Sequence, residues 1–184
     1  MAFPTDTLYG LAVNPRSAAA LDQLFAVKGR SQSRTMPLVA ADLAQVALVA
    51  RLTPQAEVLA RAFWPGPLTL VLPALPGLAV GAVEHGRVAV RIPDHPVAQA
   101  LARVVGHPVT ATSANRSGAP GTSDPSAVVA EVPSVELLID DGPAPGGPAS
   151  TIVDLGGEVP LLRREGAVAW SRVLESLGSA PDPP

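Results

Sequence analysis

A polar loop over residues 112–118 has the residue types that bind phosphate. Its sequence is Thr-Ser-Ala-Asn-Arg-Ser-Gly, and it follows an apolar segment that we expect to be a strand. Loops at strand ends in α/β sheets commonly contact ligands, and their backbone N–H groups can bind anions. The same composition is also typical of a turn that is closed by its own hydrogen bonds. The residues alone leave both interpretations open for Ser113 and Asn115.

The segment Lys28-Gly29-Arg30 ends a predicted amphipathic helix and carries two cations. A compact ammonium group beside a planar guanidinium group is suited to binding a triphosphate. Lys28 is also the only lysine among the 13 basic residues of the chain. The alternative is that both cations only stabilise the C-terminal end of the helix dipole, which is worth about 0.3–1 kcal/mol.

Residues 5–10 place the hydroxyl groups of Thr5, Thr7 and Tyr9 directly after a short apolar segment. This arrangement is typical of a binding loop at a strand end, and equally of a polar turn that leads from a strand into a helix. The residues alone do not separate these two interpretations.

Three arginines need a specific explanation, because Arg91 is predicted to be buried and Arg163 and Arg164 are adjacent. Arg91 lies inside the apolar run 88–92, where an unpaired buried charge would be very costly. It must therefore either pair with a structural carboxylate or contact an anionic ligand. Arg163 and Arg164 are adjacent, and they could form either a solvated charged segment or a clamp for phosphate.

Several common catalytic motifs are missing from the sequence. It has no P-loop, no Gly-x-Gly-x-x-Gly and no Gly-x-Ser-x-Gly segment, and it has no cysteine. His85, His95 and His107 have neither close nor helical spacing, so we interpret them as loop residues and expect no metal site made by the protein.

Composition restricts the class of protein further. The 184 residues fit one domain, with 47% hydrophobic and 16% charged residues. The net charge of -3 and the few aromatic side chains argue against extended nucleic-acid binding. No apolar run is long enough to span a membrane and no secretory signal is visible, so we expect a cytoplasmic protein.

The elements that must position these residues alternate between helix and strand, which predicts an α/β layer fold. The predicted helices cover residues 17–28, 42–52, 53–64, 96–105, a short segment from 124, and 167–177, and all but the last begin at a capping residue or a proline. The predicted strands are rich in bulky or β-branched residues and cover 37–40, 68–72, 88–92, 109–112, 135–139, 151–155 and 159–163.

Eight segments, taken together and in this order, resemble the YrdC-like family of threonylcarbamoyl-AMP synthases. They are FPTDTLYGL (3–11), KGR (28–30), PL (37–38), WPGPLT (64–69), VAVRIP (88–93), SANRSG (113–118), STIVD (150–154) and REGA (164–167). The resemblance implies a single-domain twisted mixed β-sheet flanked by helices, with an open concave ligand face. It also implies a catalytic domain over residues 1–177, without the upstream helix that relatives generally have, and a disordered tail over 178–184.

The resemblance implies that the protein makes threonylcarbamoyl-AMP from L-threonine, bicarbonate and ATP, with Mg²⁺ accompanying the ATP. The product would pass to a tRNA threonylcarbamoyl-transferase complex. The residues implied at the reacting centre are Lys28, Arg30, Ser113 and Asn115. Those implied for ATP are Arg30, Ser113 and Arg164, and those for L-threonine are Thr7, Arg91 and Ser150, with Thr5 and Tyr9 as additional candidates.

This chemistry explains the residue types. The amine of threonine adds to bicarbonate or CO2, and the resulting N-carboxylate attacks the α-phosphorus of ATP and displaces pyrophosphate. Because two anions must meet, cations are needed to offset their repulsion and the charge on the leaving group. No covalent nucleophile is required.

Two other functions remain open, and the sequence departs from the family pattern at some positions. The same concave face could serve an RNA-binding or ribosome-assembly factor, or a paralogue that handles another carbamoyl-adenylate. Ser31 stands where the family usually has proline, and the stretch 30–37 is two residues longer than the commonest form. Ala41 and Arg87 stand where some members have histidine and threonine.

Overall fold

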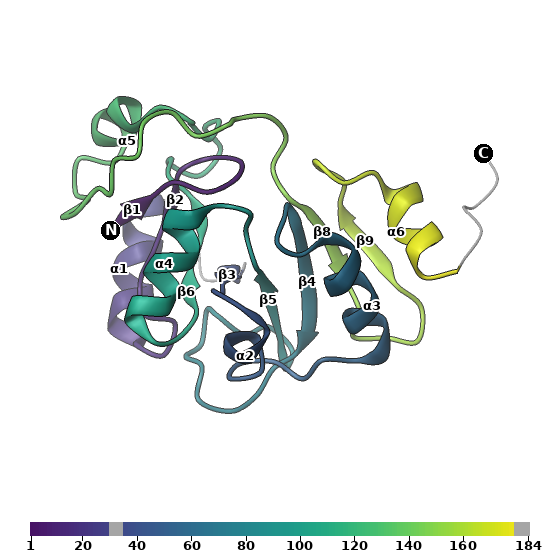
Figure 1. The fold of residues 1–184 in the computed structure, drawn as a ribbon. Helices are drawn as coiled ribbons and strands as arrows, with labels where there is room; N and C mark the ends of the chain where they lie inside the picture. Colours follow the sequence, from purple (N-terminus) through teal and green to yellow (C-terminus); the bar gives the residue numbers. More distant parts are fainter. Residues whose placement is uncertain (30–34, 179–184) are drawn as a thin grey trace.

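The strands of the protein form two sheets in a computed structural model that describes residues 1–29 and 35–178 (Figure 1). The smaller antiparallel sheet has the order β1-β2-β7, with β1 Ala2–Phe3, β2 Gly10–Leu11 and β7 Thr112–Ser113. The larger mixed sheet has the order β6-β3-β5-β4-β8-β9, with β6 Val109–Thr110, β3 Leu38–Val39, β5 Arg87–Arg91, β4 Leu68–Pro73, β8 Thr151–Asp154 and β9 Leu161–Arg164. The predicted α/β fold with a mixed sheet is confirmed.

Six helices of the described residues cover the sheets, and most begin where the sequence predicts a cap. They are α1 Ala18–Lys28, α2 Leu43–Val46, α3 Pro54–Phe63, α4 Pro96–Val105, α5 Pro125–Glu131 and α6 Trp170–Ser176. Ser17 accepts a hydrogen bond from the Ala20 amide at the start of α1, and Gly29 ends this helix in the left-handed conformation at φ 59°. No helix of the described residues is long and apolar enough to cross a membrane.

An apolar core lies against one face of the larger sheet. Leu68, Leu70 and Leu72 alternate along β4 and pack in one apolar cluster with Leu59 of α3 and Val173 of α6. These two helices lie beside β4, β8 and β9 at one end of the molecule, whereas α1 and α4 lie at the other end (Figure 1). The side chains at the intervening strand positions therefore point to the opposite face.

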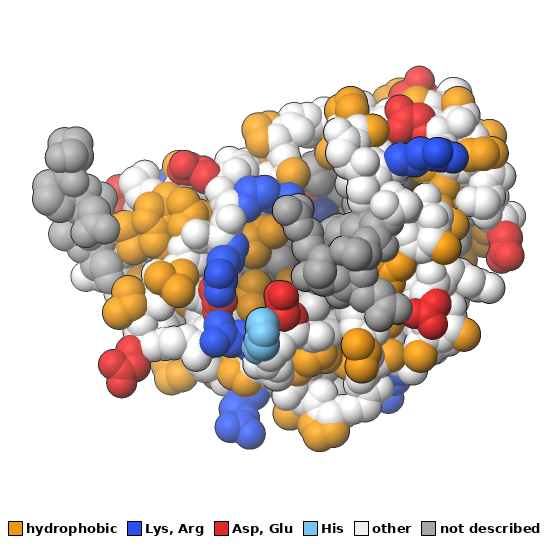
Figure 2. All heavy atoms as spheres, turned by 180° about the vertical axis from the view of Figure 1, so that it is seen from behind, with side chains coloured by type: hydrophobic (Ala, Val, Ile, Leu, Met, Phe, Trp, Pro, Cys, Tyr) orange, Lys and Arg blue, Asp and Glu red, His pale blue; other side chains and the backbone are white. Residues whose placement is uncertain are grey.

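On the face of the molecule seen from behind, Lys and Arg side chains form a column beside a hollow (Figure 2).

Three predicted elements are wrong in extent or type. The helix predicted over 42–52 ends at Val46, because the following chain turns to pair with the end of β4, with the Arg51 amide donating to the Pro73 carbonyl. The segment 135–139 forms only an isolated bridge between Leu138 and Ala2. The strand predicted over 109–112 is split between the two sheets at Ala111, whose amide donates to the Pro37 carbonyl.

This split matters for the site, because it carries the following loop from the larger sheet to the smaller one. Ser113 pairs with Gly10 of β2 and so lies beside the end of the 5–10 segment. That segment joins β1 to β2, so it is not the strand-to-helix turn that its composition also allowed. Most of the predicted tail, residues 179–184, lies outside the described residues, as do Arg30 and Ser31.

Candidate active site

A cavity of about 570 Å³ gathers polar side chains from segments far apart in the sequence. Its volume lies within the range of about 300–1,000 Å³ that is usual for small-ligand sites. Of the predicted site residues, all that fall within the described ranges line it: Thr5, Thr7, Tyr9, Lys28, Arg91, Ser113, Asn115, Ser150 and Arg164. Arg30 lies outside the described residues, so its role stays a prediction.

Lys28 lies against the loop that follows β7. Its side chain is 3% exposed, and its ammonium group donates to the Ser113 carbonyl at 2.6 Å and to Asn115 Oδ1 at 3.1 Å. The Lys28 carbonyl in turn accepts from the Ser117 amide. The two segments that the sequence singles out for phosphate therefore share one wall of the cavity.

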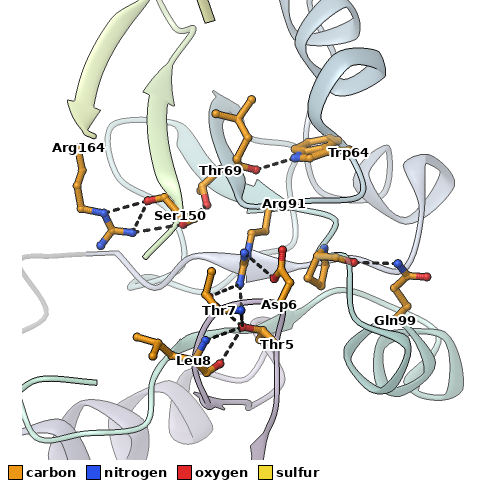
Figure 3. Close-up of polar contacts among 12 residues, drawn as sticks. Thr5, Asp6, Thr7, Leu8, Trp64, Thr69, Arg91, Gln99, Ser150 and Arg164 are labelled. Atoms are coloured by element: carbon orange, nitrogen blue, oxygen red, sulfur yellow. Dashed lines mark hydrogen bonds and ion pairs between the residues drawn. The ribbon is translucent and has the colours of Figure 1, made fainter. Parts of the chain in front are cut away.

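Residues 5–8 form a turn that is held by one hydroxyl. Thr5 Oγ1 donates to the Leu8 carbonyl at 2.8 Å and accepts from the amides of Thr7 and Leu8. This turn presents Thr5 and Thr7 to the guanidinium group of Arg91, whose Nη2 lies 3.1 Å from Thr5 Oγ1 and 3.5 Å from Thr7 Oγ1 (Figure 3).

Arg91 pairs with a carboxylate, which is one of the two alternatives that its sequence position leaves open, while its contact with an anionic ligand stays a prediction. Its Nη1 lies 2.9 Å from Asp6 Oδ1 in an ion pair, and the residue also lines the cavity. Burial lowers the pKa of Arg91, the charge of Asp6 raises it, and the charge of Arg164 lowers it again. The sequence-based interpretation did not single out Asp6, because only the fold brings the segment 5–10 against Arg91.

Arg164 and Ser150 lie together on another wall of the cavity. The guanidinium group donates to the Ser150 carbonyl at 2.8 and 3.1 Å and to the Ser150 hydroxyl at 3.3 Å. The same hydroxyl lies 2.9 Å from the hydroxyl of Thr69, a buried residue of β4 (Figure 3). Burial lowers the pKa of Arg164.

A β-bulge separates the roles of the two adjacent arginines. Ile152 pairs with Arg164 and Val153 with Leu162, so Arg163 is an extra residue in β9. A bulge of this kind redirects side chains locally. Arg163 binds the Asp154 carboxylate at 2.7 and 3.1 Å, whereas Arg164 lines the cavity. Each arginine therefore has its own partner in the protein, and contact of Arg164 with phosphate stays a prediction.

Tyr9 and Arg87 are engaged in structural contacts. The Tyr9 hydroxyl donates to the Gly142 carbonyl at 2.7 Å, and burial raises its pKa. Tyr9 is thus part of the cavity wall, with its hydroxyl committed to another loop. Arg87 binds Asp154 and is not among the residues that line the cavity. Within residues 1–29 and 35–178, no group of three His, Cys, Asp or Glu residues could hold a metal ion.

The chain is similar in sequence to a known family and to known proteins. A family model for Sua5, YciO and YrdC, described as telomere recombination, matches residues 1–166. The chain is 35% identical over 182 residues to the threonylcarbamoyl-AMP synthase of Bacillus subtilis, and this match covers 97% of the chain and 53% of that protein.

Solved structures show the same fold. The crystal structure of Pyrococcus abyssi Sua5 complexed with L-threonine superposes with a TM-score of 0.91 at 36% identity, over 97% of this chain and 54% of that one. Escherichia coli YciO superposes with a TM-score of 0.81 at 24% identity, over 91% and 83% of the two chains. The chain thus spans about half the length of the first two relatives. It belongs to the Sua5/YciO/YrdC family.

Proposed function

We propose that this protein makes threonylcarbamoyl-AMP and pyrophosphate from L-threonine, bicarbonate or CO2, and ATP, for the modification of tRNA. The observation that carries the proposal is the single cavity that collects Lys28, Ser113, Arg91 and Arg164 from separate parts of the chain. Similarity to the Bacillus subtilis synthase supports the same reaction. The product would be consumed by a tRNA threonylcarbamoyl-transferase complex.

The part of the cavity wall formed by Lys28 and the loop that follows β7 is proposed to bind the phosphates of ATP. Lys28, Ser113 and Asn115 are already joined by hydrogen bonds, so they form a preorganised polar surface. Arg164 is proposed as a further ATP contact, and Arg30 would complete the set. Cations placed here would stabilise the negative charge that develops on the departing pyrophosphate.

The part of the cavity wall formed by Arg91 and the turn at residues 5–8 is proposed to bind L-threonine. A buried guanidinium group can hold the substrate carboxylate in a charge-assisted hydrogen bond, and the hydroxyls of Thr7 and Ser150 lie within the same cavity. The neighbouring Thr5 hydroxyl is committed to the turn at residues 5–8, so its proposed contribution is to shape this wall. The L-threonine bound in the Pyrococcus abyssi relative supports an amino-acid site of this kind.

The proposed reaction needs no group from the protein as a nucleophile. The ammonium group of threonine first loses a proton to solvent, and the resulting amine bonds to the carbon of CO2. The nitrogen then loses a second proton to solvent, which leaves an N-carboxylate. An oxygen of this carboxylate then bonds to the α-phosphorus as the bond from that phosphorus to the pyrophosphate oxygen breaks. The protein would act by holding the two anions together, since positioning and charge compensation are large effects in such reactions.

Magnesium is proposed to enter with the triphosphate. The described residues offer no metal-ligating cluster, so no protein ligand is proposed for it. When bound, it would neutralise phosphate charge.

A turnover assay tests the proposal. Purified protein is incubated with ATP, labelled bicarbonate, magnesium and L-threonine, and both pyrophosphate and labelled adenylate are measured. The expected result is threonine-dependent formation of both products. A folded protein that forms neither would overturn the proposal, and turnover with a different amino acid in a parallel panel would indicate a paralogue. Salt-sensitive tRNA binding without turnover would favour an RNA-binding factor.

A further inference from the structure

We propose that Asp6 is a positioning residue that holds Arg91 in the orientation needed to bind the carboxylate of the amino-acid substrate. This inference rests on the proposed function. It concerns a residue outside the cavity lining that acts on a residue within it.

Asp6 and Arg91 form a close and largely buried ion pair. Asp6 Oδ1 lies 2.9 Å from Arg91 Nη1, and each side chain is 9% exposed. Neither oxygen of the Asp6 carboxylate accepts a hydrogen bond from a hydroxyl or a backbone N–H among the residues that the structure describes. Buried carboxylates are normally well supplied with such donors. Among the described residues the Asp6 carboxylate therefore caps no helix and closes no turn, and its evident partner is the guanidinium group.

The contacts of the Arg91 guanidinium group come from different sides. In the view of Figure 3, Asp6 lies on the side of the Arg91 guanidinium away from Ser150 and Arg164. The Nη1 atom is held by Asp6, whereas Nη2 reaches the hydroxyls of Thr5 and Thr7, which line the cavity. Asp6 thus fixes one edge of the guanidinium group and leaves the cavity side free for a ligand.

Asp6 supplies the charge that offsets the buried cation of Arg91. Burial lowers the pKa of Arg91 and the nearby Arg164 charge lowers it further, while the charge of Asp6 acts in the opposite sense. Removing the carboxylate would leave a buried cation without its counter-charge, which is strongly unfavourable. The guanidinium group would then turn toward water in the cavity and lose its alignment with Thr7.

A competing effect has the opposite sign. The Asp6 carboxylate also repels a substrate anion, so its loss by itself would strengthen threonine binding. The two effects are distinguished by the direction of the change in KM for threonine, since misplacement raises it and relief of repulsion lowers it.

The experiment compares the wild type with Asp6→Asn, Arg91→Gln and the double variant. We expect Asp6→Asn to raise KM for threonine by about tenfold or more with KM for ATP changed less than about twofold, because small misplacements of a binding group have large effects. In the Arg91→Gln background the same substitution should cause no further rise in KM for threonine, because the misplacement acts only through Arg91. A matched control is Asp154→Asn, which removes another arginine-bound buried carboxylate outside the cavity lining and should leave KM for threonine unchanged.

Several outcomes would overturn the inference. They are an unchanged or lower KM for threonine in Asp6→Asn, an equal rise in both KM values, or an undiminished effect of Asp6→Asn when Arg91 is already replaced. If Asp6→Asn does not fold, Asp6→Glu keeps the charge but moves it by one methylene group, and the same split between the two KM values is expected. An unchanged KM for threonine in this variant would also overturn the inference.

Calorimetric titration with L-threonine separates this inference from the proposed function. If the wild type shows no turnover but its threonine binding is weakened by Asp6→Asn, only the proposed function fails. If turnover occurs and binding is not weakened, only the inference fails. A wild type that does not bind threonine overturns both.

Discussion

Two arginines on the same face of β5 differ in how completely their carboxylate partners are satisfied. Asp154 accepts hydrogen bonds from Arg87, from Arg163 and from the Gly156 amide. Asp6, which faces Arg91, accepts none from the described residues beyond its ion pair. The side chains of Arg87 and Arg163 are 37% and 57% exposed, whereas that of Arg91 is 9% exposed.

The difference separates a structural cluster from a binding group. The Asp154 cluster uses its hydrogen-bonding capacity within the protein and ties β5 and β9 to β8. Arg91 is more deeply buried than Arg87 and Arg163, although the Asp154 side chain, at 3% exposed, is more buried than that of Asp6 at 9%. A guanidinium group buried in this way is costly unless its remaining donor capacity is used, and a ligand in the cavity can use it. Arg87, one of the departures from the family pattern, therefore belongs to the scaffold and not to the cavity wall.

The largest expected effect is on catalysis. Arg91→Gln should lower kcat/KM for threonine by about 10²–10³, as expected for loss of a preorganised charged contact. Arg87→Gln, on the same strand face, should leave kcat/KM within about threefold, because its charge is used by Asp154. Steady-state kinetics of pyrophosphate release check both, and similar losses in the two variants would remove the distinction.

The next effect is on stability. Asp154→Asn should lower the free energy of unfolding by about 1–3 kcal/mol, since charge-assisted hydrogen bonds are lost but both arginines can regain water. Urea unfolding followed by circular dichroism measures the change. An unaltered midpoint would show that the cluster contributes nothing to the scaffold.

The same cluster predicts an acid dependence. Burial raises the pKa of Asp154, but hydrogen bonds from Arg163 and Gly156 and the charges of Arg87 and Arg163 lower it, with a net decrease. Because the folded pKa lies below the unfolded value of about 3.9, this stabilisation is present above that pH and is lost as the pH falls through the folded pKa. Below about pH 4 the wild type should therefore lose more unfolding free energy than Asp154→Asn, and parallel pH profiles would contradict this account.

The smallest expected effect concerns the Ser150 hydroxyl. Thr69→Val removes its hydroxyl partner without changing side-chain shape, and should lower kcat/KM for threonine by about three- to tenfold, the equivalent of one hydrogen bond. Thr69→Ser should restore most of the loss. Thr110→Val, which removes another buried hydroxyl outside the cavity lining, is the control, and an equal loss there would show that the Thr69 effect is nonspecific.

Local patterns in the sequence predicted much of the fold. Capping residues and prolines located most helix starts, and bulky alternating segments located β4 and β5. The order of the larger sheet was not predictable, because it joins strands that are not consecutive in the chain. The early end of α2 and the split at Ala111 were missed for the same reason, since both depend on pairing with distant segments.

The candidate site, like the fold, could be predicted from the sequence only in part. The sequence indicates that Arg91 needs a partner. Its resemblance to a family named the residues that the structure brings together in the cavity. It does not indicate that Asp6 is that partner, because the choice depends on how the β1–β2 connection meets β5. Nor does it reveal the bulge at Arg163, which is a property of strand register and which separates two adjacent arginines with identical side chains.

A crystal structure with L-threonine and a non-hydrolysable ATP analogue tests the central claim most directly. The account predicts that the threonine carboxylate lies within about 3 Å of the Arg91 guanidinium group, with the phosphates toward Lys28 and Ser113. Threonine bound at the Arg87–Asp154–Arg163 cluster, or anywhere outside the cavity, would contradict it.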